Sequence, residues 1–224
     1  MFIAPYLNQV APGVWQRNQI IKSESIYMIE HYKEAWLQIL NSDKVHYANL
    51  LPVIKSKMPE IIGRYKKIVC PGGGFPKFET QILKATDISV IDLIADIYVD
   101  QLDSFKQIYS IAETTQISYL KSNTLSPFKV QPEYECVCFT HFLEHSESWE
   151  IVKDWIQLQQ TDIVIYGPNI EAATSINWHH YHDHNVDHNV FFTIAAIKSL
   201  AEQSGYTVKS LAYSDDLLVW MRKG

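Results

Sequence analysis

Short apolar runs alternate with segments of helical periodicity through most of the chain after residue 66. Five runs rich in β-branched and aromatic residues are typical of strands, and apolar residues recur at helical spacing in the segments between them. The predicted strands cover residues 68–70, 88–92, 116–121, 135–139 and 162–166. The predicted helices cover residues 77–85, 98–110, 148–159 and 193–203. Strands separated by helices predict an α/β fold with a doubly wound, mostly parallel sheet.

Both ends of the chain depart from this alternation. At the C-terminus, residues 206–213 and 217–221 read as two strands joined by a short polar turn, which predicts an antiparallel hairpin. At the N-terminus, residues 1–22 are aromatic and interrupted by prolines without a clear period, and we expect an irregular arm. This arm could close a site or contact a second copy of the chain, so a homodimer is possible.

Two further helices are predicted before the first strand of the sheet. Apolar residues fall near helical spacing over residues 25–40, and a second helical segment, 45–62, is kinked or restarts at Pro52. Together with the arm they predict an N-terminal helical cap. We therefore divide the chain into residues 1–62, the arm and cap, and residues 63–224, the α/β domain.

The first predicted strand ends in three consecutive glycines, Gly72, Gly73 and Gly74, and a helix follows. Glycines in such a turn let the backbone approach a ligand, and a helix N-terminus offers unpaired N–H groups. Taken alone this signal is weak, because glycine-rich turns close many ordinary βα units.

Polar side chains follow the ends of three other predicted strands. Asp92 ends the second strand, Asn123 follows the third, and Thr140 and His141 follow the fourth. In open parallel sheets, ligands bind beyond the carboxyl ends of the strands. A carboxylate at the position of Asp92 can accept two hydrogen bonds from a ribose diol. The sequence therefore predicts a nucleoside-type ligand at this edge.

Composition, net charge and cysteine spacing limit the classes of protein to which the chain can belong. The chain has 224 residues, of which 47% are hydrophobic and 20% charged, so it can bury a sizeable core. The net charge of -6 argues against a nonspecific grip on nucleic acid. The three cysteines, Cys70, Cys136 and Cys138, have no spacing typical of zinc sites. We expect reduced, buried thiols in a cytoplasmic protein, with no signal peptide and no membrane span.

The segment after the fourth predicted strand carries the tripeptide Leu143-Glu144-His145. With the glycine turn and Asp92, it resembles class I S-adenosylmethionine-dependent methyltransferases of the group with a Leu-Glu-His motif after strand four. The resemblance covers about residues 60–224. It implies a Rossmann-like methyltransferase fold and methyl transfer with S-adenosylmethionine as cofactor. The acidic charge balance of the chain favours a small-molecule acceptor over nucleic acid.

The resemblance also implies a role for individual residues. In this family the first strand and its glycine loop hold the methionine part of the cofactor, the acid after strand two holds the ribose, and the residue after strand three contacts adenine. The cofactor-binding residues implied here are Cys70, Gly72, Gly73, Gly74, Asp92, Asn123 and Thr140.

Two histidines are candidates for acid–base chemistry beside the cofactor. If the acceptor is a hydroxyl or a protonated amine, a general base assists methyl transfer, and His141 and His145 are the candidates. In the alternative interpretation, His145 packs structurally and Glu144 caps the turn.

Three positions depart from the family pattern. Cys70 stands where the family usually has an acid, Pro76 where it has a final glycine, and Asn123 where it often has aspartate. These departures support an alternative function, a catalytically degenerate protein that keeps the fold and acts as a binding or regulatory partner. The intact glycines and Asp92 argue against this alternative.

Residues 178–189 contain five of the nine histidines. We interpret them as a substrate-facing loop in which His182 and His184 bind the acceptor. A metal-assisted methyltransferase that binds a divalent ion through these imidazoles, and a solvated loop without chemistry, are the alternatives. The segment also resembles the His-x-His-x-Asp-His signature of metal-dependent hydrolases, but it is one residue too long between His184 and Asp187. A metal-dependent hydrolase using the cluster His179–His188 is thus a third candidate function, and we assign no metal ligand.

Overall fold

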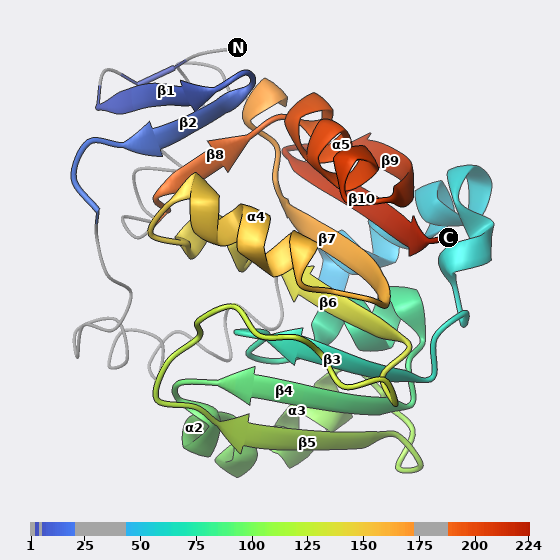
Figure 1. Ribbon diagram of the computed structural model, residues 1–224. Helices are drawn as coiled ribbons and strands as arrows, with labels where there is room; N and C mark the ends of the chain where they lie inside the picture. Colours follow the sequence, from blue (N-terminus) through green and yellow to red (C-terminus); the bar gives the residue numbers. More distant parts are fainter. Residues whose placement is uncertain (1–2, 5, 21–43, 173–187) are drawn as a thin grey trace. The chain divides into compact units, whose positions relative to one another are not determined.

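The computed structural model describes residues 3–4, 6–20, 44–172 and 188–224. Its larger sheet has seven strands in the order β5-β4-β3-β6-β7-β10-β9 (Figure 1). The pairs β3–β4, β4–β5 and β3–β6 are parallel, whereas β10 runs antiparallel to both β7 and β9. The predicted fold class, a mostly parallel α/β sheet with a C-terminal antiparallel hairpin, is confirmed.

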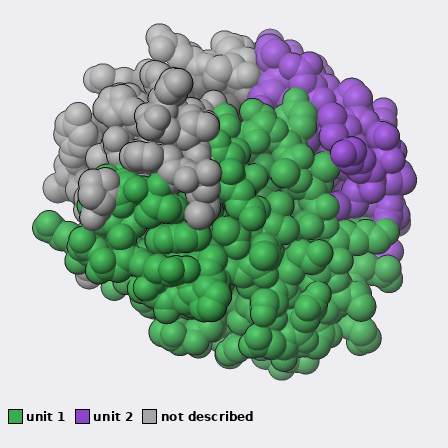
Figure 2. Space-filling model, turned by 90° about the horizontal axis from the view of Figure 1, so that it is seen from above, with its two compact units in different colours: residues 1–23, 126–130, 139–224 green, residues 24–125, 131–138 purple. Residues whose placement is uncertain are grey.

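The described residues form two compact units, shown in different colours in Figure 2. Unit 1 comprises residues 1–23, 126–130 and 139–224, and unit 2 comprises residues 24–125 and 131–138. The division predicted from the sequence, 1–62 and 63–224, stays a prediction. Among the described helices, none combines the length and the apolar character that crossing a bilayer requires.

Unit 2 contains the parallel strands that the sequence predicts. They are β3 (Lys67–Pro71), β4 (Asp87–Asp92), β5 (Gln116–Lys121) and the first residues of β6 (Cys136–Thr140). The middle strands are buried on both faces, which is why they are continuous apolar runs and do not alternate. Ile68, Cys70, Ile88 and Val90 are all fully buried.

The helices of unit 2 are shorter than predicted. The helix expected at 77–85 is present over residues 77–83, with π-helical hydrogen bonding over η2 (Glu79–Leu83), and it ends where Lys84 takes a left-handed conformation. The helix expected at 98–110 starts earlier and is divided at Gln101 into α2 (Ala95–Asp100) and α3 (Leu102–Ile108). Helix α2 packs on β4 and β5.

Before β3, unit 2 contains part of the predicted helical cap. Residues 44–57 are helical without a break at Pro52, so the helix does not restart there, and η1 (Pro59–Ile61) follows. The other cap helix, predicted at 25–40, lies outside the described residues.

Unit 1 contains the C-terminal elements close to their predicted positions. They are α4 (Trp149–Gln157), β7 (Asp162–Pro168), η4 (Ile170–Ala172), α5 (Ile194–Gln203), β9 (Tyr206–Tyr213) and β10 (Asp216–Lys223). The side chains of Ser148 and Thr193 cap α4 and α5, because each accepts a hydrogen bond from the backbone N–H three residues later. Helix α5 packs on β9 and β10.

The N-terminal arm is not irregular, which corrects the expectation from the sequence. Strands β1 (Leu7–Ala11) and β2 (Val14–Arg17) form a hairpin, and β2 pairs with β8 (Val190–Phe192) in a second, antiparallel sheet (Figure 1). Its own apolar cluster lies beneath the sheet and consists of Ala4, Leu7, Trp15, Ile170 and Phe191.

Candidate functional site

The glycine turn of unit 2 follows β3 and requires glycine at three consecutive positions. Gly72 and Gly74 have left-handed backbone angles, φ 60° and 50°, which are unfavourable for residues with a side chain. At Gly73, a Cβ atom would lie 2.8 Å from the Cβ of Cys70, closer than real Cβ atoms approach. The predicted tight turn is therefore present, and its backbone lies directly over the strand that precedes it.

Asp92 lies at the end of β4 with only 6% of its surface exposed. Its two carboxylate oxygens accept hydrogen bonds from the N–H groups of Ile94, at 2.9 Å, and Gly74, at 3.3 Å. Burial raises the pKa of Asp92, and the backbone N–H groups partly oppose this shift. A carboxylate can accept about four hydrogen bonds, so Asp92 retains acceptor capacity for a ligand hydroxyl.

A second acid, Glu79, is buried near the glycine turn and was missed in the sequence. Burial raises the pKa of Cys70 well above its usual value, as do a hydrogen bond with Cys138 and the nearby charge of Glu79. The Cys70 thiol is therefore uncharged at neutral pH. Burial also raises the pKa of Tyr119, and the charges of Asp92 and Glu79 add to this shift. Glu79, Cys70, Asp92 and Tyr119 thus form one electrostatically coupled group.

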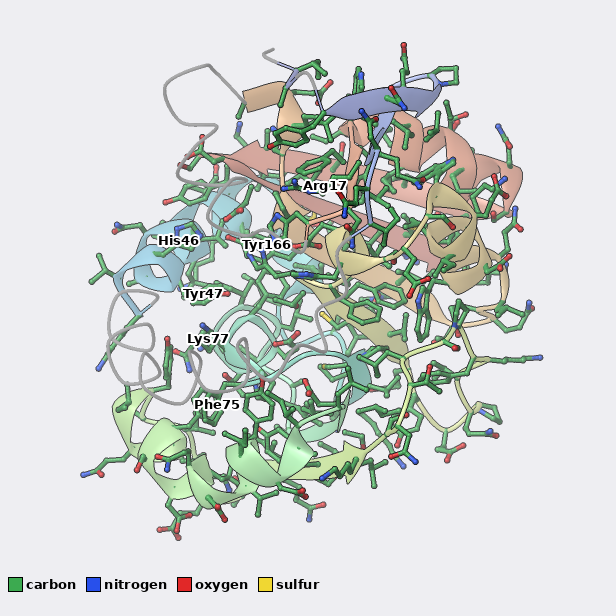
Figure 3. All side chains as sticks on the ribbon, turned by 90° about the vertical axis from the view of Figure 1, so that its left-hand side faces the viewer. Arg17, His46, Tyr47, Phe75, Lys77 and Tyr166 are labelled. Atoms are coloured by element: carbon green, nitrogen blue, oxygen red, sulfur yellow. The ribbon has the colours of Figure 1, made fainter. Side chains whose placement is uncertain are left out.

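Aromatic rings pack beside the glycine turn. Phe75, labelled in Figure 3, stacks on Phe105 with ring centroids 4.8 Å apart and meets Tyr98 edge to face at 5.2 Å. Tyr98 also stacks on Tyr119 at 5.6 Å, and its hydroxyl lies within 3.2 Å of the position that a Cβ at Gly74 would take. These contacts fix the conformation of the turn.

Asn123, the predicted adenine contact, is exposed in the loop that follows β5. The preceding residue, Ser122, donates its backbone N–H to the carbonyl oxygen of Asp92 at 3.0 Å. This bond extends the pairing of β4 with β5 by one residue, and the contact of Asn123 with adenine stays a prediction.

In unit 1, the predicted residues Thr140 and His141 lie where β6 ends. His141 has a left-handed φ of 48° and donates its backbone N–H to the carbonyl oxygen of Tyr166 at 2.8 Å. Its imidazole is 44% exposed, meets the Tyr166 ring edge to face, and places Nδ1 3.3 Å from Oε1 of Glu144. Tyr166, labelled in Figure 3, donates its hydroxyl to Asp216 at 2.6 Å. His141 is thus an accessible imidazole with an oriented ring.

The Leu-Glu-His tripeptide forms a single 3-10 turn, η3 (Leu143–His145). Glu144 is buried, with 3% exposure, and His145 is half-buried. The ring of His145 meets the ring of the buried His188 edge to face, with centroids 4.8 Å apart. His145 therefore belongs to a buried group with Glu144 and His188. Because 43 residues separate His145 from His188, sequence spacing gave no signal of this contact. His182 and His184, the predicted acceptor-binding residues, lie outside the described residues.

Comparisons with known proteins give similarity in structure and none in sequence. No protein-family model and no curated protein matches the sequence. Among solved structures, an O-methyltransferase family protein from Burkholderia thailandensis aligns over 90% of this chain with a TM-score of 0.60 and 12% identity. The mitomycin 7-O-methyltransferase gives the same three values. This chain spans 61% and 59% of the length of these two proteins.

A third similar structure is closer to this chain in length. The magnesium protoporphyrin IX methyltransferase from Synechocystis PCC 6803, solved with bound SAH, aligns over 84% of this chain and 88% of its own, with a TM-score of 0.54 and 9% identity. The chain has the class I methyltransferase fold. At these identities the similarity establishes the fold alone.

Proposed function

We propose that this protein transfers a methyl group from S-adenosylmethionine to a small-molecule acceptor. The observation that carries the proposal is the junction of the glycine turn with Asp92, where the N–H of Gly74 bonds to the carboxylate that ends the next strand. The glycine turn and the carboxylate at the end of the next strand are the two elements that the sequence predicts for a nucleoside site. The carboxylate keeps acceptor capacity for a ribose diol.

The fold neighbours support the same assignment. Those described above are methyltransferases by name, and one of them was solved with S-adenosylhomocysteine, the demethylated cofactor. The negative net charge of this chain favours a small molecule over nucleic acid as acceptor. We therefore keep the acceptor class predicted from the sequence.

A buried acid, Glu79, lies near Cys70, the position that departs from the family pattern. The family resemblance implies an acid near the methionine amino group, and a neutral Cys70 thiol cannot supply that charge. Glu79 is fully buried, and its charge acts on Cys70 and on Tyr119. We propose that Glu79 provides the negative charge that the family usually places at the position of Cys70. This argues for a functional cofactor site and against the degenerate alternative.

The chemistry asks the protein mainly for positioning and for proton transfer. The cofactor supplies an activated methyl group on a sulfonium, and in-line placement of the acceptor provides much of the rate. An acceptor hydroxyl must lose its proton as its oxygen bonds to the methyl carbon. Of the two candidate bases, His141 has the exposed imidazole and a carboxylate, Glu144, beside its Nδ1. We propose that His141, and not His145, is the base.

Isothermal titration calorimetry of the full chain with S-adenosylmethionine and S-adenosylhomocysteine tests the proposal. We expect saturable binding of both ligands by the wild type. Asp92→Asn removes the charge that accepts the ribose hydroxyls, which is worth about 1.5–3 kcal/mol and predicts affinity roughly ten- to a hundredfold weaker.

Asp87→Asn is a matched control, because Asp87 begins the strand that Asp92 ends. The same change of charge at the other end of β4 should leave binding unaltered. Absence of binding to a folded wild type, or equal weakening by the two substitutions, would overturn the assignment of this site.

A further inference from the structure

We propose that Glu144, His145 and His188 form a binding site for one divalent transition-metal ion, such as Zn²⁺, Mn²⁺ or Co²⁺. One ligand atom from each residue, a carboxylate oxygen and two imidazole nitrogens, lies within 4.8 Å of the other two. No other group of three such residues meets this condition in the part of the chain that the structure describes.

The three ligand atoms lie close enough together to bind one cation after small movements of their side chains. Two ligands bound to zinc at about 2.1 Å in a tetrahedral site are roughly 3.4 Å apart. Starting from separations of up to 4.8 Å, small side-chain rotations of Glu144, His145 and His188 suffice to reach that distance. Three protein ligands leave at least one coordination position for water or for an oxygen of a bound molecule.

The two segments that carry the ligands are held together by backbone contacts. The N–H of Asn189 donates to the carbonyl oxygen of Glu144 at 2.7 Å, and its side-chain amide donates to the carbonyl oxygen of His145 at 3.4 Å. Arg17, labelled in Figure 3, donates its Nε to the carbonyl oxygen of His188 at 2.5 Å and its backbone N–H to Asn189 at 2.9 Å. The site is thus fixed by residues that do not contact the ion, as metal sites require.

Electrostatics favours a cation at this position. Glu144 is 3% exposed, and its Oε1 accepts no hydrogen bond within the described part of the chain. A buried carboxylate needs a compensating charge, because desolvation penalises an isolated anion. His141 lies 3.3 Å from Oε1 but is 44% exposed and carries a charge only when protonated. A divalent ion would supply the missing charge whatever the protonation state of His141.

The ligand set selects the class of metal. Two imidazoles and one carboxylate suit zinc and the neighbouring first-row ions, whereas Mg²⁺ and Ca²⁺ prefer sites made of oxygen alone. We therefore expect weak competition from Mg²⁺. The histidine-rich segment 179–187 is not needed for this set.

The role of the ion, unlike its binding, rests on the proposed methyltransferase function. A bound cation acts as a Lewis acid and lowers the pKa of an oxygen that it coordinates. An acceptor hydroxyl bound there would give its proton to a base such as His141. The site therefore points to an oxygen acceptor.

The test measures metal directly, without cofactor or acceptor. The full chain is depleted of metal with a chelator, loaded with Zn²⁺ or Co²⁺, passed through gel filtration and analysed for metal content. We expect about one ion per chain in the wild type and at least a tenfold weaker affinity in Glu144→Gln and His188→Gln. Glu150→Gln changes an exposed glutamate of α4 and is the matched control. A double variant, His182→Gln with His184→Gln, should keep the ion, because neither histidine belongs to the proposed ligand set.

The wild type alone also decides the question if the variants fail to fold. Visible absorption of the Co²⁺ form and X-ray absorption of the Zn²⁺ form should show two imidazole nitrogens among the ligands, and millimolar Mg²⁺ should not displace the ion. No bound ion, or binding that survives Glu144→Gln and His188→Gln in folded protein, would overturn the site. Because cofactor binding is measured separately, this result is distinguishable from failure of the proposed function.

Discussion

Burial of Asp92 stabilises the neutral, protonated carboxyl group relative to the charged carboxylate. Burial raises its pKa from the model-compound value of 3.8, so the folded protein binds a proton there more tightly than the unfolded chain does. Stability from this group is then fully present below the unfolded pKa and is lost as the pH rises through the folded pKa. At neutral pH the charged carboxylate costs stability, which is expected of a group kept for binding.

This linkage predicts opposite effects of Asp92→Asn on stability and on binding. Between pH 3.5 and 7, the free energy of unfolding of the wild type should fall relative to that of the variant, by roughly 1.4 kcal/mol for each unit by which the pKa is raised. Chemical denaturation of both proteins across this range measures the difference, and Asp87→Asn serves as the control. A difference independent of pH would contradict the raised pKa of Asp92.

At the residue scale, the sequence revealed positions fixed by local geometry and missed those fixed by distant contacts. Three successive glycines and an acid at a strand end are local signals, and Gly72, Gly74 and Asp92 have the predicted conformations and place. Glu79 gave no signal, because one acid on a short helix usually faces solvent. The pairing of His145 with His188 depends on the fold of unit 1.

At the element scale, the N-terminal hairpin is coupled to helix α5 through one glycine. Gly13 has a φ of 71°, its carbonyl oxygen accepts the backbone N–H of Thr193, and a Cβ there would lie 2.5 Å from the Thr193 hydroxyl. That hydroxyl caps α5. The turn between β1 and β2 thus fits against the cap of a helix 180 residues later in the chain.

We expect Gly13→Ala to lower the free energy of unfolding by about 2–4 kcal/mol, from left-handed strain together with loss of the α5 cap. Gly205→Ala is the control, because Gly205 has a similar φ of 78° but nothing within 4 Å of its Cβ position. It should cost only the backbone strain, about 1–2 kcal/mol. Urea unfolding of both variants measures the difference, and equal losses would show that the contact with Thr193 is unimportant.

Among the elements, those with strong local patterns were predicted and those made by distant pairing were not. Strand β5 has the predicted bounds, and α5 (Ile194–Gln203) lies within the predicted range 193–203. Strands β1 and β2 were not recognised, because they are short and only one face of β1 is buried, at Leu7. Their sheet is completed by β8, whose residues lie more than 170 positions later in the sequence. Periodicity within a window cannot reveal such a partner.

At the scale of the whole molecule, the two proposed sites draw on different residues. The cofactor proposal rests on Asp92 and the glycine turn of unit 2, and the metal proposal rests on Glu144, His145 and His188 of unit 1. A ligand that binds only the folded state raises stability by about 2.7 kcal/mol at a hundred times its Kd. For a chain of this size that corresponds to a rise in Tm of roughly 5–10 °C.

We therefore expect the two thermal shifts to be lost separately. Asp92→Asn should lose most of the shift with S-adenosylhomocysteine and keep the shift with Zn²⁺, whereas Glu144→Gln should do the reverse. Differential scanning calorimetry of the wild type and both variants, with each ligand alone and with both together, measures this. Loss of both shifts in one variant would mean that the substitution acts on folding or that one ligand binds through the other. Two independent losses would establish that the chain provides separate sites for the methyl donor and for a metal ion.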